Sequence, residues 1–465
     1  MDLKKCQIFT PKDTVKYMLD QIEYRDNIFN KKIIDNSCGT GNFLVEIARR
    51  FILDGISQQK SKKTIKKSLQ KYIVGFEIDK KLLDECIDNL NLVASEFGIK
   101  NVEWNVVNGD GLYANEEEKY DYVVGNPPYI AYTDLDEKTR KSTKDNFVSC
   151  SLGKYDYSYA FIEKGLNLLR DGGKMAMITP SNMFKTVFGE NIRNIIRDEL
   201  ICIVDCASLK IFGKVLTAPA ITVYQKNNNS SIVIYKEIKK NESINEKLIE
   251  KSKLIGKWNF TEYVECGQKR FGDYFKVSNS IATLANKVFI HTLNDKGDID
   301  IDVEKEVLRT TKSPKTEQFG ISQKIIFPYA YKENELLRYS ELEMKNKFPK
   351  TMKYLASKRD ILDNRDSDKS AYWYEYGRSQ AIRHLNCEKL LLSTIITKKI
   401  RVYYLDKTTI PYSGLYIIPK NQEPLSNAEL VLKTERFYQY LVSKGVKVSG
   451  DSIRISSKDI EDYKY

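Results

Sequence analysis

The first half of the chain alternates short β-branched segments with amphipathic ones, and this alternation restricts the fold more than any other feature. Residues 31–51 have the pattern of a strand, a glycine-bearing turn and a helix, and the pattern repeats from the strand-like residues 72–79 onward. Strand-like segments at 174–180 and 202–208 continue it. Strands that alternate with helices are typical of a mainly parallel, doubly wound α/β sheet. In such a sheet, functional loops are expected at the carboxyl ends of the strands.

The pattern changes near Asn227, where a polar segment of low complexity begins. We therefore predict a first domain at 1–228, a linker at 229–254 without a buried strand, and a second domain at 255–465. The second domain mixes short strand-like segments with turns, which indicates an α+β fold. The lysine-rich residues 57–71 predict a solvated helix face or loop, and contact with nucleic acid is the alternative.

Composition limits the class of protein. The 465 residues are 42% hydrophobic and 30% charged, which is typical of globular domains rather than disordered or fibrous chains. No segment reaches the roughly 18 apolar residues that a membrane span needs, and the first residues lack the apolar core of a signal peptide. We therefore expect a cytoplasmic protein. Eight scattered cysteines and two histidines argue against a disulfide framework or a zinc cluster.

The net charge of +12 is unevenly distributed. Residues 1–226 carry 33 basic and 31 acidic side chains, whereas residues 227–465 carry 42 basic and 32 acidic ones. A basic half that is rich in tyrosine favours a polyanionic partner, because neutralising phosphates drives most non-specific affinity for nucleic acids. A lysine-rich surface that only serves solubility is the alternative.

Polar and glycine residues follow the first two predicted strands. Asp35 ends the first strand, Gly39 and Gly41 lie in the turn into the next helix, and Glu77 ends the second strand. The turn lacks the lysine of a phosphate-binding loop and the third glycine of a dinucleotide fingerprint. An acid at the tip of the second strand can accept hydrogen bonds from ribose hydroxyls. The pattern predicts a site for a nucleoside-bearing cofactor, and an ordinary helix-entry turn is the alternative for the two glycines.

The tetrapeptide Asn126-Pro127-Pro128-Tyr129 follows an apolar strand and is the most informative motif. Two consecutive prolines fix the backbone and remove two donors, so the nearby carbonyls become rigid acceptors beside the Asn126 amide oxygen. Such acceptors can receive both hydrogens of an exocyclic amine, which localises the nitrogen lone pair and directs it at an electrophile. Tyr129 offers a flat ring on which a base can stack. A Pro-Pro turn that merely ends a strand is the structural alternative.

With these motifs in this order, residues 1–226 resemble the amino DNA methyltransferases that methylate adenine N6 with S-adenosylmethionine, in the permuted, gamma-type order. The N-terminal motif of that family matches Gln7 to Pro11. The loop at Asp35 to Phe43 resembles the family's cofactor loop and differs only in having Asn-Ser-Cys where Asn-Pro-Ala-Cys is common. The resemblance implies a Rossmann-like class I methyltransferase fold. The cofactor-binding residues that it implies are Thr10, Pro11, Asp35, Ser37, Cys38, Gly39, Gly41, Glu77, Ile78, Asp110, Gly111 and Asn126.

The resemblance also assigns the catalytic and base-stacking residues. It makes Asn126, Pro127, Pro128 and Tyr129 the catalytic tetrapeptide, and it makes Phe212 the ring that faces Tyr129 across a flipped adenine. It implies direct methyl transfer without a covalent intermediate, a histidine base or a metal. None of the eleven prolines precedes a cysteine, so the Pro-Cys nucleophile of cytosine C5 methylation is absent.

The second half resembles, more loosely, the DNA target-recognition region of restriction-modification methylases, over residues 275–283, 327–329 and 373–380. Arginine and glutamine side chains match the major-groove edges of guanine and adenine, so the candidates for DNA recognition are Arg378, Gln380 and Arg383. Phosphate contact or bracing of the fold is the alternative for these three residues.

These resemblances imply duplex DNA as the partner, in the bacterial-type cytoplasm that holds the nucleoid, and a cognate restriction endonuclease as a further partner. RNA adenine, cytosine N4 and protein glutamine methylation remain alternatives, as does a non-enzymatic DNA-specificity subunit. Intact Asp35, Glu77, Asp110 and Asn126 argue against the non-enzymatic reading. We expect no N-terminal cleavage domain before Thr10, and we find no nuclease constellation downstream.

Overall fold

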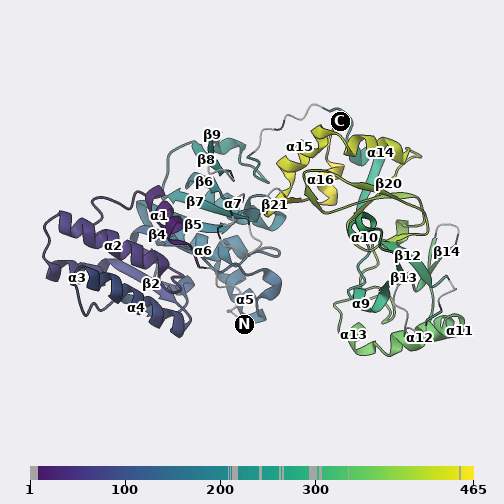
Figure 1. Cartoon of the computed structure of the whole chain (residues 1–465), viewed down its shortest axis with the longest axis horizontal. Helices are drawn as coiled ribbons and strands as arrows, with labels where there is room; N and C mark the ends of the chain where they lie inside the picture. The colour runs from purple at the N-terminus through teal and green to yellow at the C-terminus, as the bar shows by residue number, and fades with distance from the viewer. Residues whose placement is uncertain are drawn as a thin grey trace. The chain divides into compact units, whose positions relative to one another are not determined.

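The structure is a computed structural model that describes residues 9–207, 209, 211, 218–239, 243–260, 263, 267–292, 301–302, 306–332, 335–449 and 452–465. The chain divides into two compact units, which Figure 1 shows coloured along the sequence. Unit 1 comprises Met1–Phe260 and Val446–Asp451, and unit 2 comprises Thr261–Gly445 and Ser452–Tyr465. A short segment near the end of the chain therefore belongs to the N-terminal unit.

Within the described residues, one nine-stranded sheet forms the centre of unit 1, in the order β3-β2-β1-β4-β5-β7-β6-β8-β9. Strands β7 and β9 run antiparallel to their neighbours, and all other pairings are parallel. The predicted mainly parallel α/β sheet is thereby confirmed. The strands are β1 (Ile33–Asp35), β2 (Ile73–Glu77), β3 (Asn105–Asn108), β4 (Tyr120–Gly125), β5 (Leu169–Pro180), β6 (Leu200–Asp205), β7 (Pro219–Gln225), β8 (Ile232–Ile238) and β9 (Ile244–Glu250).

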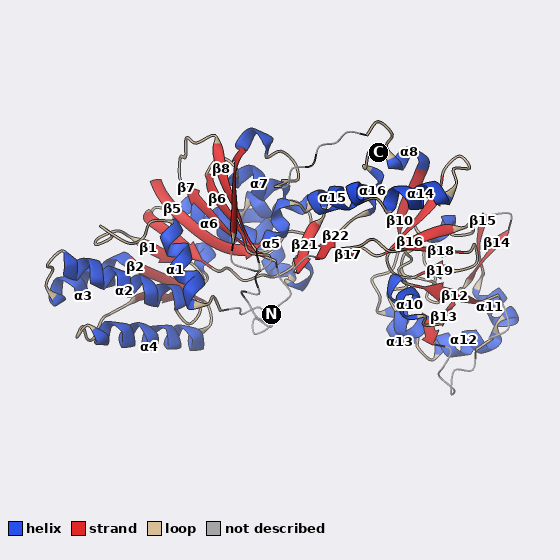
Figure 2. Cartoon of the chain, turned by 45° about the horizontal axis from the view of Figure 1, so that its top comes forward, coloured by secondary structure: helices blue, strands red, loops and turns tan. Residues whose placement is uncertain are grey.

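Helices cover both faces of this sheet (Figure 2). Successive strand residues point to opposite faces, so Ile33 and Val124 join the core beneath α1, α2 and α4, whereas Ile34 and Val123 join the core beneath α6. The helices are α1 (Lys12–Gln21), α2 (Asn42–Ser57), α3 (Lys62–Tyr72), α4 (Lys80–Glu96), α5 (Glu137–Asn146), α6 (Ser158–Leu168) and α7 (Glu190–Ile196), with the short 3₁₀ helices η2 (Gly111–Tyr113), η3 (Tyr132–Asp134), η4 (Val148–Cys150), η5 (Ser181–Phe184), η6 (Val187–Gly189) and η7 (Lys251–Lys253).

The lysine-rich segment forms α3, which begins at the N-cap Ser61. Its side chains divide as an amphipathic helix requires: Ile65 and Leu69 are buried, whereas Lys62 and Lys67 are exposed. The expected solvated helix face is therefore present. None of the described helices has the length and apolar character that crossing a membrane would require.

Residues 229–254 differ from the prediction, because they do not form a linker. Strands β8 and β9 form a hairpin at the edge of the sheet, with Val233 buried in the core and Lys236 paired with Glu246 at 3.6 Å. An edge hairpin has one solvated face, so its sequence is polar enough to resemble a linker. Unit 1 continues to Phe260, which packs edge-on against Phe184 at 5.2 Å between ring centroids.

Unit 2 is a mixture of small sheets and short helices, in agreement with the predicted α+β fold. Strands β10, β20, β16 and β18 form an antiparallel sheet. Strands β11, β13, β12 and β19 form another sheet, in which β12 and β19 are parallel. The strands are β10 (Phe275–Asn279), β11 (Ile290–Thr292), β12 (Leu308–Lys312), β13 (Gln323–Ile326), β14 (Tyr329–Lys332), β15 (Glu335–Arg338), β16 (Lys389–Leu392), β17 (Ile395–Thr397), β18 (Val402–Leu405), β19 (Ile410–Pro411), β20 (Leu415–Pro419) and β22 (Ser452–Arg454), while β21 (Val446–Ser449) lies in unit 1. The helices are α8 (Phe271–Tyr274), α9 (Asn286–Phe289), α10 (Pro314–Phe319), α11 (Glu341–Lys347), α12 (Pro349–Ala356), α13 (Arg359–Asp363), η8 (Ile382–His384), α14 (Leu425–Leu432), α15 (Glu435–Lys444) and α16 (Ser457–Glu461).

Candidate active site

A cavity of about 230 Å³ lies in unit 1 at the carboxyl ends of β1, β2, β3 and β4. Strand β1 pairs with β2 on one side and with β4 on the other, so the order of the sheet reverses here. Ligands of doubly wound sheets bind at this kind of switch point. The cavity is lined by Phe9, Thr10, Asn36, Ser37, Cys38, Gly39, Asn42, Phe43, Phe76, Glu77, Ile78, Asp79, Leu82, Gly109, Asp110, Gly111, Asn126, Pro127, Pro128, Tyr129, Thr139, Tyr157 and Phe161.

The turn between β1 and α2 requires its two glycines. Gly39 and Gly41 have φ angles of 55° and 88°, which side chains rarely adopt. Gly41 is also the N-cap of α2, and a Cβ atom at this position would lie 2.6 Å from the Cys86 sulfur. The turn therefore brings backbone against the cavity at Gly39 while α2 packs closely on α4.

The carboxylate of Glu77 is held in place by two backbone donors. The Gly39 N–H donates to its Oε2 at 2.9 Å, and the Asp79 N–H donates to its Oε1 at 2.8 Å. Burial raises the pKa of Glu77, and these two hydrogen bonds oppose that rise. A carboxylate has about four acceptor positions. Glu77 can therefore still accept two hydroxyl groups from a ligand in the cavity.

Asp110 lies on the same wall of the cavity as Glu77. Its Oδ1 accepts the Leu112 N–H at 3.0 Å, and burial raises its pKa. The following residue, Gly111, passes so close to the first loop that an added Cβ would lie 2.0 Å from the Asn36 carbonyl oxygen. Only glycine permits this approach, which brings the β3 loop against the β1 loop.

Beneath the first loop lie buried polar atoms that have no hydrogen-bond partner among the described residues: one carboxylate oxygen of Asp35, the amide oxygen of Asn36 and the hydroxyl of Ser37. The other oxygen of Asp35 accepts the Ser37 N–H at 3.0 Å. Burial raises the pKa of Asp35 to about 7, with an opposing contribution from the Ser37 N–H and a further rise from Glu77. Buried polar atoms are rarely left unpaired, and of these residues Asn36 and Ser37 line the cavity, so their two atoms are candidates for contact with a polar ligand group.

The tetrapeptide follows β4 directly and lines the cavity with all four residues. The Tyr129 hydroxyl donates to the Ile178 carbonyl on β5 at 2.9 Å, and burial raises the pKa of Tyr129. The Tyr157 N–H donates to the Ile130 carbonyl at 3.0 Å, which ties the segment to the start of α6. The ring of Tyr129 is therefore fixed at both the hydroxyl and the backbone.

Most predicted site residues in unit 1 line this one cavity. Three do not line it: Pro11 is the N-cap of α1, Gly41 is the N-cap of α2, and Asp35 lies at the end of β1. Phe212 lies outside the described residues, as do Gln7, Ile8 and Gly213. The assignment of each residue to cofactor or substrate stays a prediction.

Sequence reasoning missed an aromatic pair in the cavity. Tyr157 and Phe161 pack edge to face, with ring centroids 5.5 Å apart and an interplanar angle of 80°. Both rings line the cavity from α6. Their spacing of four residues indicates one helix face, and an aromatic helix face is most often part of a core. Only the parallel order of β4 and β5, which brings α6 across this edge of the sheet, could have shown that these two rings line a cavity and are not ordinary core residues.

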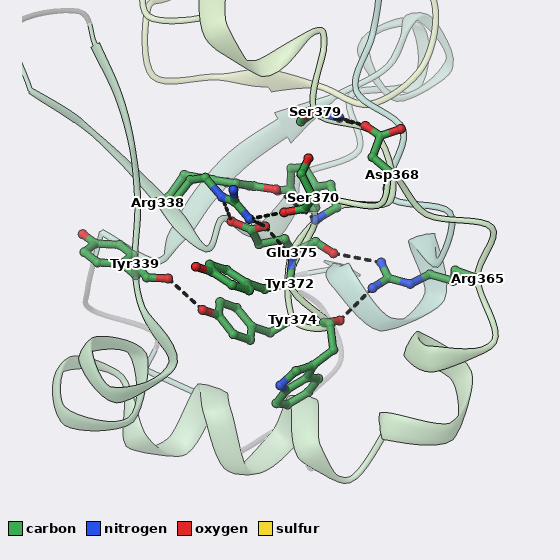
Figure 3. A network of polar contacts seen from close by, with 12 residues as sticks. Arg338, Tyr339, Arg365, Asp368, Ser370, Tyr372, Tyr374, Glu375 and Ser379 are labelled. Atoms are coloured by element: carbon green, nitrogen blue, oxygen red, sulfur yellow. Dashed lines mark hydrogen bonds and ion pairs between the residues drawn. The ribbon is translucent and has the colours of Figure 1, made fainter.

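In unit 2, the segment that contains the DNA-recognition candidates is held by a polar network (Figure 3). Arg338 pairs with Glu375 at 2.6 Å, and Arg365 donates to the Trp373 carbonyl at 2.7 Å. The aromatic residues of the three segments that resembled a recognition region are largely core. The buried ones are Phe275, Phe327, Tyr329, Tyr374 and Tyr376.

The three candidates for DNA recognition differ in their surroundings. The Arg378 guanidinium contacts Asp366 at 2.8 Å and Asp368 at 3.1 Å, so two of its five donors already have carboxylate partners. Gln380 and Arg383 are exposed. This geometry favours the bracing alternative for Arg378 and leaves the assignment of the other two as a prediction.

The sheet order and the position of the cavity are those of the class I methyltransferase fold. Residues 39–212 match the Eco57I restriction-modification methylase family. The Type II restriction enzyme and methyltransferase RM.Eco57I of Escherichia coli is 22% identical over an alignment that covers 83% of this chain and 48% of that protein. The Type II methyltransferase M.BstVI of Geobacillus stearothermophilus is 23% identical over an alignment that covers 97% of this chain and 88% of that protein. The predicted resemblance to restriction-modification methylases is therefore confirmed.

Similarity to a solved structure extends over both units. The Type IIL restriction-modification enzyme MmeI, determined in complex with DNA, superposes with a TM-score of 0.64 at 13% identity. The superposition covers 97% of this chain and 65% of MmeI, and at this identity it shows a shared fold. The chain spans about half of the E. coli relative, at 48% of its length.

Proposed function

We propose that this chain is a site-specific DNA methyltransferase that transfers a methyl group from S-adenosylmethionine to N6 of an adenine flipped out of duplex DNA. One observation carries the proposal: the same cavity is lined by two carboxylates suited to a nucleoside, Glu77 and Asp110, and by the Asn-Pro-Pro-Tyr tetrapeptide that ends at Tyr129. A nucleoside-bearing methyl donor and an exocyclic amine could therefore meet within it.

The residues present fit S-adenosylmethionine. Glu77 has acceptor capacity for the two ribose hydroxyls, and Asp110 has it for the adenine amine of the cofactor. The unpartnered polar atoms of Asn36 and Ser37, which line the cavity, would serve the charged methionine end. Gly39, with a φ angle of 55°, places no side chain against the cavity, and Gly111 allows the β3 loop to pack on the Asn36 carbonyl.

The tetrapeptide would position the target base. The Asn126 amide oxygen and the adjacent carbonyl would accept the two hydrogens of the adenine amine, while the fixed ring of Tyr129 stacks on the base. The bound cofactor supplies an electrophilic methyl group on a sulfonium. Stacking is worth about 1–3 kcal/mol per base, which offsets part of the few kcal/mol that flipping costs.

The partner that fits the rest of the chain is DNA. The excess of basic side chains lies beyond residue 226, in the part of the chain that contains unit 2. MmeI was determined in complex with DNA, and the E. coli relative is both a restriction enzyme and a methyltransferase. These similarities support a modification activity within a restriction-modification system, paired with a cognate endonuclease.

The test is to incubate the full chain with labelled S-adenosylmethionine and with unmethylated duplex DNA, single-stranded DNA or RNA. Nucleoside mass spectrometry then identifies the modified base, and single-molecule sequencing gives its sequence context. We expect N6-methyladenine in duplex DNA at one recognition sequence. Label on cytosine N4, on RNA, on protein or on nothing would refute the proposal.

A further inference from the structure

A lysine from the last part of the chain reaches the end of strand β6 in unit 1. Strand β21 belongs to unit 1, although residues 261–445, which belong to unit 2, separate it in the sequence from the rest of unit 1. The Lys447 Nζ lies 2.7 Å from Asp205 Oδ2 and 3.2 Å from Glu237 Oε1. The side chain of Asp205 is 9% exposed and that of Lys447 is 23% exposed, so the ion pair is largely removed from water.

The Asp205 carboxylate joins several segments at this point. Its Oδ1 accepts the Ala207 N–H at 2.9 Å, and its Oδ2 accepts the Tyr235 hydroxyl on β8 at 2.7 Å in addition to Lys447. Burial alone would raise the pKa of Asp205, but attraction and hydrogen bonds, chiefly from Lys447, lower it overall. The carboxylate is therefore charged at neutral pH and depends on Lys447 for its counter-ion.

This ion pair lies next to the elements that hold the catalytic tetrapeptide. The end of β6 connects to this tetrapeptide through two neighbouring strands, β7 and β5. The Tyr129 hydroxyl donates a hydrogen bond to the carbonyl of Ile178 on β5. Ile178 pairs with Ile221 on β7, and β7 also pairs with β6. Strand β21 also packs against η5, the turn that follows β5.

We propose that Lys447 is a positioning residue for methyl transfer: by pairing with Asp205 it fixes the carboxyl end of β6. Through β7 and β5 this holds the Ile178 carbonyl that accepts the Tyr129 hydroxyl, and thereby the ring on which the target base stacks. The inference rests on the proposed function. Removing one partner of a buried ion pair leaves the other charge uncompensated, so the end of β6 must rearrange or admit water when Lys447 is lost. The rearrangement would reach Tyr129 while leaving the cofactor loops, on β1 to β3, in place.

The experiment compares Lys447→Met with Lys447→Arg and with the control Lys174→Met in the full chain. Lys174 forms a 2.6 Å ion pair with Glu23 on β5, away from the carboxyl end of that strand. The lysine side chain is 20% exposed, close to the value for Lys447, but Glu23 is 72% exposed, so this pair lacks a buried carboxylate. Each variant is measured for single-turnover methyl transfer to duplex DNA, for affinity for S-adenosylmethionine, and for hydrogen exchange of the backbone at residues 126–131 and 205–207.

We expect Lys447→Met to slow methyl transfer by about tenfold or more, the scale of a misplaced reacting group, with affinity for the cofactor within about threefold of wild type. Hydrogen exchange should rise in both segments, Lys447→Arg should recover most of the rate, and Lys174→Met should change neither rate nor exchange. If Lys447→Met proves poorly folded, the double variant Asp205→Asn with Lys447→Met removes both charges and should restore folding without restoring the rate.

Two results are decisive in different ways. Unchanged exchange at residues 126–131 in Lys447→Met overturns the positioning role, whatever the substrate of the wild-type protein, because this measurement needs no DNA. A wild-type protein that methylates no DNA refutes the proposed function instead. Normal transfer by Lys447→Met, beside an active wild type, overturns only the inference.

Discussion

Substitution of Glu77 by alanine should weaken binding of S-adenosylmethionine while leaving DNA binding almost unchanged. In the structure both oxygens of Glu77 are fixed, by the Gly39 N–H at 2.9 Å and by the Asp79 N–H at 2.8 Å. The carboxylate thus requires no reordering to accept the ribose hydroxyls, and its loss removes two charge-assisted hydrogen bonds. Such bonds contribute roughly 1.5–3 kcal/mol each when shielded from water.

Glu77 is only half-buried, so water can replace part of the hydrogen bonding that the substitution removes. The total loss of binding free energy should therefore be close to the contribution of one shielded hydrogen bond. A loss of about 1.5–3 kcal/mol corresponds to a dissociation constant roughly 10- to 150-fold higher. Isothermal titration calorimetry of the cofactor measures this directly, and thermal unfolding without cofactor checks that the variant is folded.

The matched control is Glu96→Ala, which removes an exposed glutamate of α4 paired with Arg49 and far from the cavity lining. It should leave the cofactor affinity unchanged. A folded Glu77→Ala protein that binds the cofactor as tightly as Glu96→Ala would refute the reasoning, since the ribose would then have to lie elsewhere.

Three further predictions follow from the same cavity and from unit 2. Asn126→Ala should reduce single-turnover transfer by about 100-fold or more, with cofactor affinity within a few fold, because the amide acts on the target amine; near-normal turnover would contradict this. Because the folded-state pKa of Asp35 is raised to about 7 by burial, the ligand-free protein should lose stability as pH rises from about 4 to 7. Asp35→Asn should reduce this dependence in thermal unfolding, while Asp156, whose pKa burial raises to about 6, should retain part of it. Gln380→Ala should relax one position of the recognition sequence at a cost of about 1–3 kcal/mol, whereas Arg378→Ala should lower stability without changing sequence preference, as rates on single-base variants of the site would show.

The sequence was sufficient to predict the cavity because its key residues end strands. Glu77, Asp110 and Asn126 each follow a short apolar segment, and parallel strands place their carboxyl ends along one edge of the sheet. Glycines at Gly39 and Gly111 are equally local signals, since each is required by a φ angle or by a close backbone approach. Local sequence therefore determines the part of the cavity that contains Gly39, Glu77 and Asp110.

Other features depend on contacts between distant segments and could not be predicted in this way. The hairpin of β8 and β9 has a polar sequence because one of its faces is solvated, and only its pairing with β6 identifies it as part of the sheet. The aromatic residues around Trp373 belong to a segment that resembles a target-recognition region, yet Tyr374 and Tyr376 are buried in the core of unit 2. Aromatic composition alone does not distinguish a stacking platform from a core.

The position of Asp205 bears on whether the two halves of the chain are separable. A chain that ends at residue 228 would lack Tyr235 and Lys447, so the Asp205 carboxylate would lose the two side chains that donate to it. A buried carboxylate without these partners either takes up a proton or opens the end of β6 to water. Such a fragment would keep the loops at Glu77 and Asp110 but not the fixed carboxyl end of β6. The last part of the chain thus contributes to the N-terminal unit itself, and its loss should impair the chemical step for a reason separate from any loss of DNA recognition.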